Sequence, residues 1–224
     1  MSGHAIRRLG WALAATAVFG LAAAQDPVNL DDLKSRASAG DKAATRRLAD
    51  LYYAGREGVE QDFREAARWY EKLAKLGDAR AQTSLGLMYA RGYGVEKDLR
   101  KAHRYWSFAA AQNDPGAQFN LGLSYSLGQG VAQDFERAAE WYRKAAIRGH
   151  VQAQHNLGML YHLGKGVDRD PLRAYFWVKV AALQGDAIAR NSVTVLAADL
   201  TPEQIREADA DAETWRAKAR NLAR

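Results

Sequence analysis

A pattern of residues that recurs about every 36 positions constrains this chain more than any other feature. Each copy opens on a Gly-Asp dipeptide or a close variant, followed by a leucine and then, one helical turn later, by a tyrosine. The opening dipeptides are Gly40-Asp41, Gly77-Asp78, Asn113-Asp114, Gly149-His150 and Gly185-Asp186. Matched columns at a single period predict a tandem array of one structural unit.

The repeated residues predict that each unit is a pair of α-helices. The leucine and the tyrosine lie on one face of a first helix, and the glycine-rich loop that follows ends that helix. An aspartate then suits the N-cap of a second helix, whose alanine and aromatic columns form an apolar stripe. These aspartates are Asp62, Asp98, Asp134 and Asp170, and the aromatic residues are Trp69, Tyr105, Trp141 and Trp177.

We therefore expect an all-α fold, a right-handed α-solenoid of tandem helix-turn-helix repeats with a C-terminal capping helix. One helix pair buries too little surface to be stable alone, whereas stacked pairs share a continuous core. The expected units are a signal peptide at 1–24, a lead-in helix in 25–39, repeats at 40–76, 77–112, 113–148 and 149–184, and a half repeat with the cap at 185–224. Residues 202–222 should form the capping helix, because Thr201-Pro202-Glu203-Gln204 is typical of a helix start.

The N-terminus has the three regions of a secretory signal. Arg7 and Arg8 precede an apolar run, and Ala22-Ala23-Ala24 provides the small residues expected before a cleavage site. An uncleaved membrane anchor is the alternative, but the run is only about 13 residues long, whereas a spanning helix needs about 20. We expect export with cleavage after Ala24, giving a periplasmic or secreted protein without a membrane span.

The composition excludes several classes of function. The chain has no cysteine, which rules out disulfides, thiolate metal sites and cysteine nucleophiles. The net charge of +6 falls to about +4 without Arg7 and Arg8, and acids alternate with bases along the chain. No nucleic-acid-binding stripe is indicated.

No catalytic, cofactor or metal motif stands out. The Gly-x-Ser-x-Gly signature is absent, and the glycine loops recur after every first helix, so they are turns rather than phosphate cradles. His155 and His162 share a predicted helix face, but two helical turns separate them by about 10 Å, too far to bind one zinc ion. We predict no catalytic residue, cofactor or metal site. Trp106 and Phe108 are aromatic residues that the repeated columns leave unexplained.

The repeated pattern resembles the Sel1-like repeats, which are relatives of the tetratricopeptide repeat. The third unit shows it in Asn113-Asp114, Ala117-Gln118, Leu121-Gly122, Tyr125, Gly128, Gly130-Val131, Asp134, Ala138, Trp141 and Ala145-Ala146. The resemblance covers about residues 40–200 and implies an adaptor that presents a concave groove to proteins or peptides, with no common catalytic residues. A cysteine-rich secreted branch is linked to β-lactam binding and hydrolysis, but this chain lacks the paired cysteines.

By analogy with related repeats, positions on either side of the repeat leucine should line the groove. These candidates are Arg46, Asp50, Thr83, Leu87, Phe119, Leu123, His155 and Met159, with Tyr53, Ala90, Ser126 and His162 one turn further along. The groove would be polar at its N-terminal end and more apolar and aromatic near Phe119. We hypothesise that Phe119, Leu123, His155 and Met159 anchor a partner segment. The alternative is that they fill the wall between neighbouring helices.

The expected function is that of an exported, non-catalytic scaffold that binds a protein or peptide, such as a cell-envelope protein. The alternative is a cell-envelope enzyme or ligand-binding protein that acts on cell-wall glycan or β-lactam-like compounds. A deep closed pocket with buried titratable groups would favour that alternative, whereas an open groove would favour the scaffold.

Overall fold

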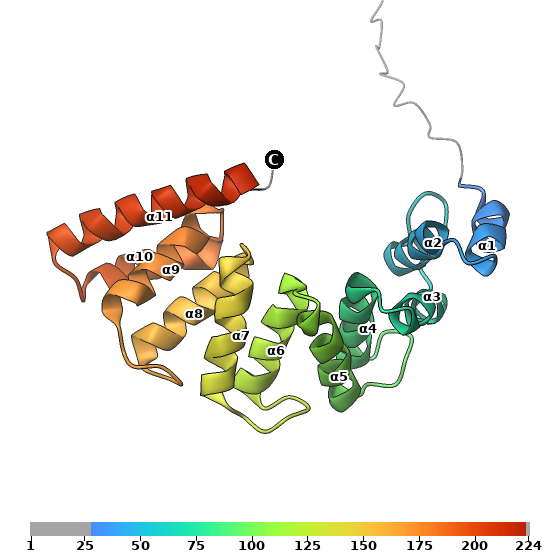
Figure 1. Cartoon of the computed structure of the whole chain (residues 1–224), viewed down its shortest axis with the longest axis horizontal. Coiled ribbons are helices and arrows are strands. Elements are labelled where there is room, and N and C mark those ends of the chain that lie inside the picture. The colour runs from blue at the N-terminus through green and yellow to red at the C-terminus, as the bar shows by residue number, and fades with distance from the viewer. Residues whose placement is uncertain (1–27, 223–224) are drawn as a thin grey trace, which may run out of the picture.

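The computed structural model describes residues 28–222, and this part of the chain is entirely helical, without a β-strand (Figure 1). The helices are α1 (Leu30–Ser38), α2 (Lys42–Ala54), α3 (Phe63–Lys75), α4 (Ala79–Arg91), α5 (Leu99–Ala111), α6 (Pro115–Leu127), α7 (Phe135–Ile147), α8 (Val151–Leu163), α9 (Pro171–Leu183), α10 (Ala187–Ala197) and α11 (Pro202–Leu222). The predicted signal peptide lies outside the described residues. No described helix is long and apolar enough to cross a bilayer.

The helices are stacked along an open arc (Figure 1). The helices α1 to α10 pack mainly on their neighbours in the sequence, so the pairs α2–α3, α4–α5, α6–α7 and α8–α9 form four successive helical hairpins. In Figure 1, α2 and α4 lie toward the hollow of the arc, and α3 and α5 lie toward its outside. The predicted α-solenoid is confirmed. We refer to α2, α4, α6, α8 and α10 as the first helices, and to α3, α5, α7 and α9 as the second helices.

Side-chain caps explain where the helices begin. The carboxylate of Asp62 accepts hydrogen bonds from the backbone N–H groups of Arg64 and Glu65, and Asp98, Asp134 and Asp170 cap the later second helices in the same way. The first helices α2, α4, α6 and α8 end at glycines in the left-handed conformation, such as Gly128 with φ 67°. The predicted caps are therefore confirmed.

The small residue next to each repeat leucine allows the two helices of a hairpin to approach closely. A Cβ atom on Gly122 would lie 2.5 Å from the ring of Tyr142, and one on Gly86 would lie 2.5 Å from Nε1 of Trp106. This contact explains Trp106: its ring packs across Gly86, and its indole N–H donates to the carbonyl oxygen of Thr83 at 3.2 Å.

A second loop glycine joins one repeat to the previous one. A Cβ atom on Gly130 would lie 2.2 Å from the carbonyl oxygen of Leu99, at the start of the preceding second helix. Gly94 and Gly166 have equally close backbone contacts. Gly58 has the corresponding place in the first repeat, where no repeat precedes it, and a Cβ atom there would meet nothing within 4 Å. The glycine thus serves the contact between repeats.

The capping helix α11 closes the C-terminal end of the array by packing on α9 (Figure 1). Its start is a capping box, since Thr201 N–H donates to Gln204 and Gln204 N–H donates to the Thr201 hydroxyl. Along its length, Asp209 accepts a hydrogen bond from the hydroxyl of Tyr175 at 2.9 Å and lies 2.8 Å from Lys179 Nζ. These polar contacts fix the helix against α9.

Candidate partner-binding surface

One column of predicted groove residues holds consecutive repeats together. Arg46 forms an ion pair with Asp78, and the hydroxyl of Thr83 donates to Asp114 at 2.9 Å. Both aspartates are the N-cap residues of the next first helix. Each of these side chains therefore reaches from its own repeat to the beginning of the next one.

The same column continues through Phe119 and His155. The phenyl ring of Phe119 stacks on His150, the N-cap residue of α8, and Nε2 of His155 lies 3.4 Å from the hydroxyl oxygen of Ser192 on α10. Phe119 is also close to Tyr142 and is only partly exposed. These contacts favour the alternative reading for Phe119 and His155, in which they fill the wall between neighbouring helices.

His150 acts as a neutral cap. Its Nδ1 accepts the backbone N–H of Ala153 at 3.3 Å, which requires an unprotonated nitrogen at that position. Burial lowers the pKa of His150 below its usual value and outweighs the opposing effect of Asp114. An uncharged imidazole therefore replaces the aspartate cap and gives Phe119 a flat surface to contact.

The second predicted column is more open. Leu87, Leu123 and Met159 are partly exposed on α4, α6 and α8. Asp50, their counterpart on α2, accepts a hydrogen bond from the Tyr70 hydroxyl at 2.7 Å. Burial, followed by this bond, raises the pKa of Tyr70 far above its usual value. Asp50 therefore supports its own hairpin, while the three apolar residues remain accessible.

Sequence reasoning missed several exposed apolar residues of the first helices. Leu127 and Leu163, at the ends of α6 and α8, are 54% and 53% exposed, and Val195 on α10 is 67% exposed. The signal for Leu127 and Leu163 is a leucine directly before the glycine that ends the helix, where the second repeat has Arg91, whereas Val195 stands at the repeat position of Leu123 and Met159. We define the apolar stripe as the exposed or partly exposed apolar residues at these two repeat positions on the first helices of the C-terminal half. It comprises Leu123, Leu127, Met159, Leu163 and Val195.

The surface of the first helices near the N-terminus is polar instead. A hollow of about 350 Å³ is lined there by Arg47, Asp50, Leu51, Tyr53, Ala54, Arg56, Glu57, Tyr70 and Arg80. Arg47 and Glu57 form an ion pair of 2.5 Å across it. The surface of the first helices therefore changes from charged near the N-terminus to apolar in the C-terminal half.

The remaining histidines have separate surroundings. Nδ1 of His162 lies 3.9 Å from Asp199, which also pairs with Arg169 at 2.5 Å. Nδ1 of His103 lies 2.9 Å from the hydroxyl oxygen of Ser124, and burial lowers the pKa of His103. Across residues 28–222, no group of three or more His, Asp or Glu side chains could hold a metal ion.

A row of hairpins with an open first-helix face defines the class of helical repeat scaffolds. A family model described as the Sel1 repeat matches residues 42–78, 79–114, 115–150 and 151–186. The chain belongs to the Sel1 repeat family. The matched units begin two residues after the expected ones, at the first residue of each first helix.

Solved structures show the same architecture. The chain is 34% identical to c5321, a protective antigen of uropathogenic Escherichia coli with an SLR fold, over 86% of this chain and 43% of that one, with a TM-score of 0.78. A Sel1 repeat protein from Oxalobacter formigenes is 32% identical over 86% of this chain and 78% of its own, with a TM-score of 0.70. This chain thus spans less than half of c5321. No curated protein sequence matches it significantly.

Proposed function

We propose that this protein is an exported, non-catalytic scaffold that binds a segment of a partner protein along the apolar stripe. The observation that carries the proposal is the exposure of Leu127 and Leu163 in corresponding places on α6 and α8, together with Val195 of α10 at the place that Leu123 and Met159 hold. Contiguous exposed apolar side chains are characteristic of interaction sites. The family also consists of repeat scaffolds, which supports binding rather than chemistry.

The arrangement of the first helices indicates the form of the partner segment. Successive first helices such as α6 and α8 hardly contact each other, because a second helix packs on both. An extended chain advances about 3.3 Å per residue, so several residues of the segment would separate the side chains that lie over successive first helices. Two arginines at the charged end of the first helices, Arg56 and Arg80, suit acidic residues in the same segment.

A crosslinking experiment tests this assignment. A photoreactive amino acid at position 163 of the full chain, expressed in a bacterial envelope, should crosslink a discrete partner, and the added substitution Leu127→Asp should abolish the product. The matched control places the photoreactive group at Ile147, which is 59% exposed at the end of a second helix and lies outside both proposed sites. Equal products from both positions, or a product that survives Leu127→Asp, would contradict the proposal.

Export is tested separately. The segment around Ala22-Ala23-Ala24 supports cleavage that leaves Gln25 as the new N-terminus. Sequencing of the mature protein from the envelope fraction should give Gln25 first. Recovery of intact Met1 in the cytoplasmic fraction alone would refute export without affecting the binding proposal.

A further inference from the structure

Two of the second helices, α3 and α7, carry an aromatic ring whose face is covered by a lysine. Nζ of Lys72 lies 4.0 Å from the ring centroid of Trp69, and Nζ of Lys144 lies 4.1 Å from that of Trp141. In both helices the lysine stands three residues after the tryptophan, on the same face. The lysine thus covers part of the ring face in a cation–π contact.

The helix α9 replaces this lysine by an apolar residue, and there another helix packs on it. Val180 stands at the lysine position and is fully buried. The ring of Trp177 meets Trp215 of α11 edge to face, with centroids 6.1 Å apart. Asp209 of α11 adds carboxylate contacts to Tyr175 and Lys179. An apolar residue at the lysine position is thus accompanied by an amphipathic helix that carries a carboxylate.

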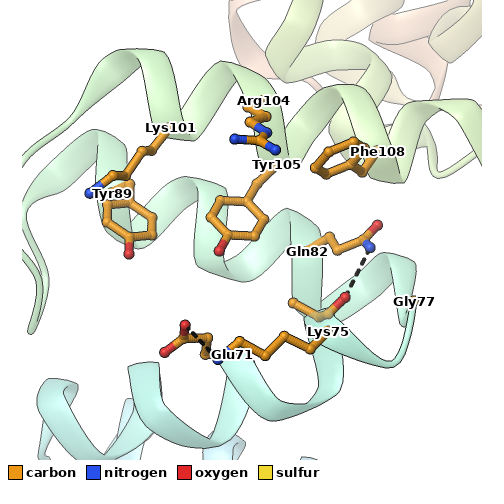
Figure 2. Close-up of a pocket in the computed structure, with 10 residues that line it drawn as sticks. Glu71, Lys75, Gly77, Gln82, Tyr89, Lys101, Arg104, Tyr105 and Phe108 are labelled. Atoms are coloured by element: carbon orange, nitrogen blue, oxygen red, sulfur yellow. Dashed lines mark hydrogen bonds and ion pairs between the residues drawn. The ribbon is translucent and has the colours of Figure 1, made fainter.

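The helix α5 has the same replacement but keeps the residue exposed. Phe108 stands at the lysine position and is 47% exposed. Beside it lies a hollow of about 610 Å³, with walls from α3, α4 and α5 (Figure 2). On its floor, Tyr105 stacks on Tyr89 with centroids 5.6 Å apart and ring planes within 9°. The volume is large enough for one or two bulky side chains.

The rim of this hollow is mainly basic. Nζ of Lys101 lies 5.2 Å from the Tyr89 ring, and the guanidinium of Arg104 lies 5.5 Å from the Phe108 ring (Figure 2). Glu71 is the acid in the lining, and it pairs with Lys75 at 3.0 Å. The charges of Lys101 and Arg104 therefore favour an occupant that carries carboxylates.

We propose that the hollow formed by Tyr89, Tyr105 and Phe108 binds an acidic amphipathic helix of a partner protein, one that inserts a large aromatic or aliphatic side chain and directs carboxylates to Lys101 and Arg104. The internal precedent is the packing of α11 on α9. This site is formed by α3, α4 and α5, whereas the apolar stripe lies on α6, α8 and α10, so the two sites are tested independently.

The test uses a defined probe, a fluorescein-labelled, helix-forming synthetic peptide with one tryptophan flanked by glutamates, titrated into the full chain and followed by fluorescence anisotropy. Saturable binding is expected, and it should weaken as salt concentration rises. Phe108→Lys, which restores the residue of the first and third repeats, should weaken binding at least tenfold, and Arg104→Glu should do the same. Ile147→Asp, at an exposed apolar residue at the end of α7, should leave binding unchanged.

Three results would overturn the proposal. The first is the absence of saturable binding to the unmodified chain. The second is binding by the Phe108→Lys and Arg104→Glu variants as tight as binding by the unmodified chain, with each variant checked by circular dichroism to be folded. The third is displacement of the peptide by an anionic oligosaccharide, trigalacturonate, at lower concentration than by unlabelled peptide, which would assign the hollow to a glycan.

Discussion

The phenyl ring of Phe119 lies nearly parallel to the imidazole of His150, with centroids 4.4 Å apart and planes inclined by 17°. One repeat earlier, the same two places are held by Thr83 and Asp114, which form a hydrogen bond. The residue that reaches across a junction and the cap that it meets are therefore matched in chemistry. A hydroxyl meets a carboxylate, and an aromatic ring meets an aromatic ring.

This matching predicts coupled effects of substitution at the junction. Phe119→Thr should lower the free energy of unfolding by about 2 kcal/mol, because a half-buried ring is removed. Adding His150→Asp should restore part of that loss, because the pair then reproduces Thr83 and Asp114. Urea unfolding of both single variants and the double variant should give a coupling energy of at least about 0.5 kcal/mol. Additive effects would contradict the matching.

The pKa of His150 predicts a loss of stability in mild acid. Burial lowers its folded-state pKa, whereas the unfolded imidazole protonates near the usual value of about 6.5. Between this pH and the folded-state pKa, the unfolded state binds more protons than the folded state. The free energy of unfolding therefore decreases as the pH is lowered from about 6.5 to the folded-state pKa. Urea midpoints measured between pH 5 and 7.5 should fall less steeply for His150→Asn. His103, whose pKa burial also lowers, contributes in the same direction and remains in both proteins.

The loop glycines predict a difference between two identical substitutions. Gly130→Ala should destabilise the chain strongly, by about 3 kcal/mol, because the added Cβ would overlap the backbone of Leu99 and because φ is positive. Gly58→Ala has the same unfavourable φ but meets no neighbour, so it should cost only about 1 kcal/mol. Thermal unfolding would compare the stability of the two variants. An equal loss of stability in both would show that Gly130 has no special role in the contact between repeats.

The contact between Tyr175 and Asp209 should contribute to the stability of the capping helix α11 on α9. Burial, followed by the hydrogen bond to Asp209, raises the pKa of Tyr175 to about 12. Asp209→Asn should bring that pKa closer to its usual value in an ultraviolet titration. It should also weaken the hydrogen-exchange protection of α11 by about 1 kcal/mol, with Asp211→Asn on the exposed side as the control. Unchanged protection in Asp209→Asn would show that apolar packing alone holds the helix.

The fold could be predicted because repetition makes each structural signal appear several times. One glycine or aspartate is a weak sign of a helix end, but the columns of Asp62 and Gly128 recur in every hairpin, and the structure shows the same caps in each. The capping helix was likewise visible in Thr201-Pro202-Glu203-Gln204. Local rules of helix capping were sufficient at these positions.

The candidate surface was predicted less well. Helical periodicity places Phe119 and Leu123 near the same face, but it does not give the rotation of one repeat relative to the next. That rotation directs Phe119 to the junction and leaves Leu127 in solvent. The hollow beside Phe108 depends on three helices from two repeats, so no single segment of sequence contains it.

The paired residues at the junctions also restrict how an array of this kind can change in evolution. If the fourth unit were moved to follow the first, Arg46 would face His150 in place of its carboxylate partner Asp78. Duplication or shuffling of a unit would therefore create a junction whose two residues do not match. A new copy would be retained only with a compensating change in its neighbour. The linear order of the units is itself encoded in the side chains at their borders.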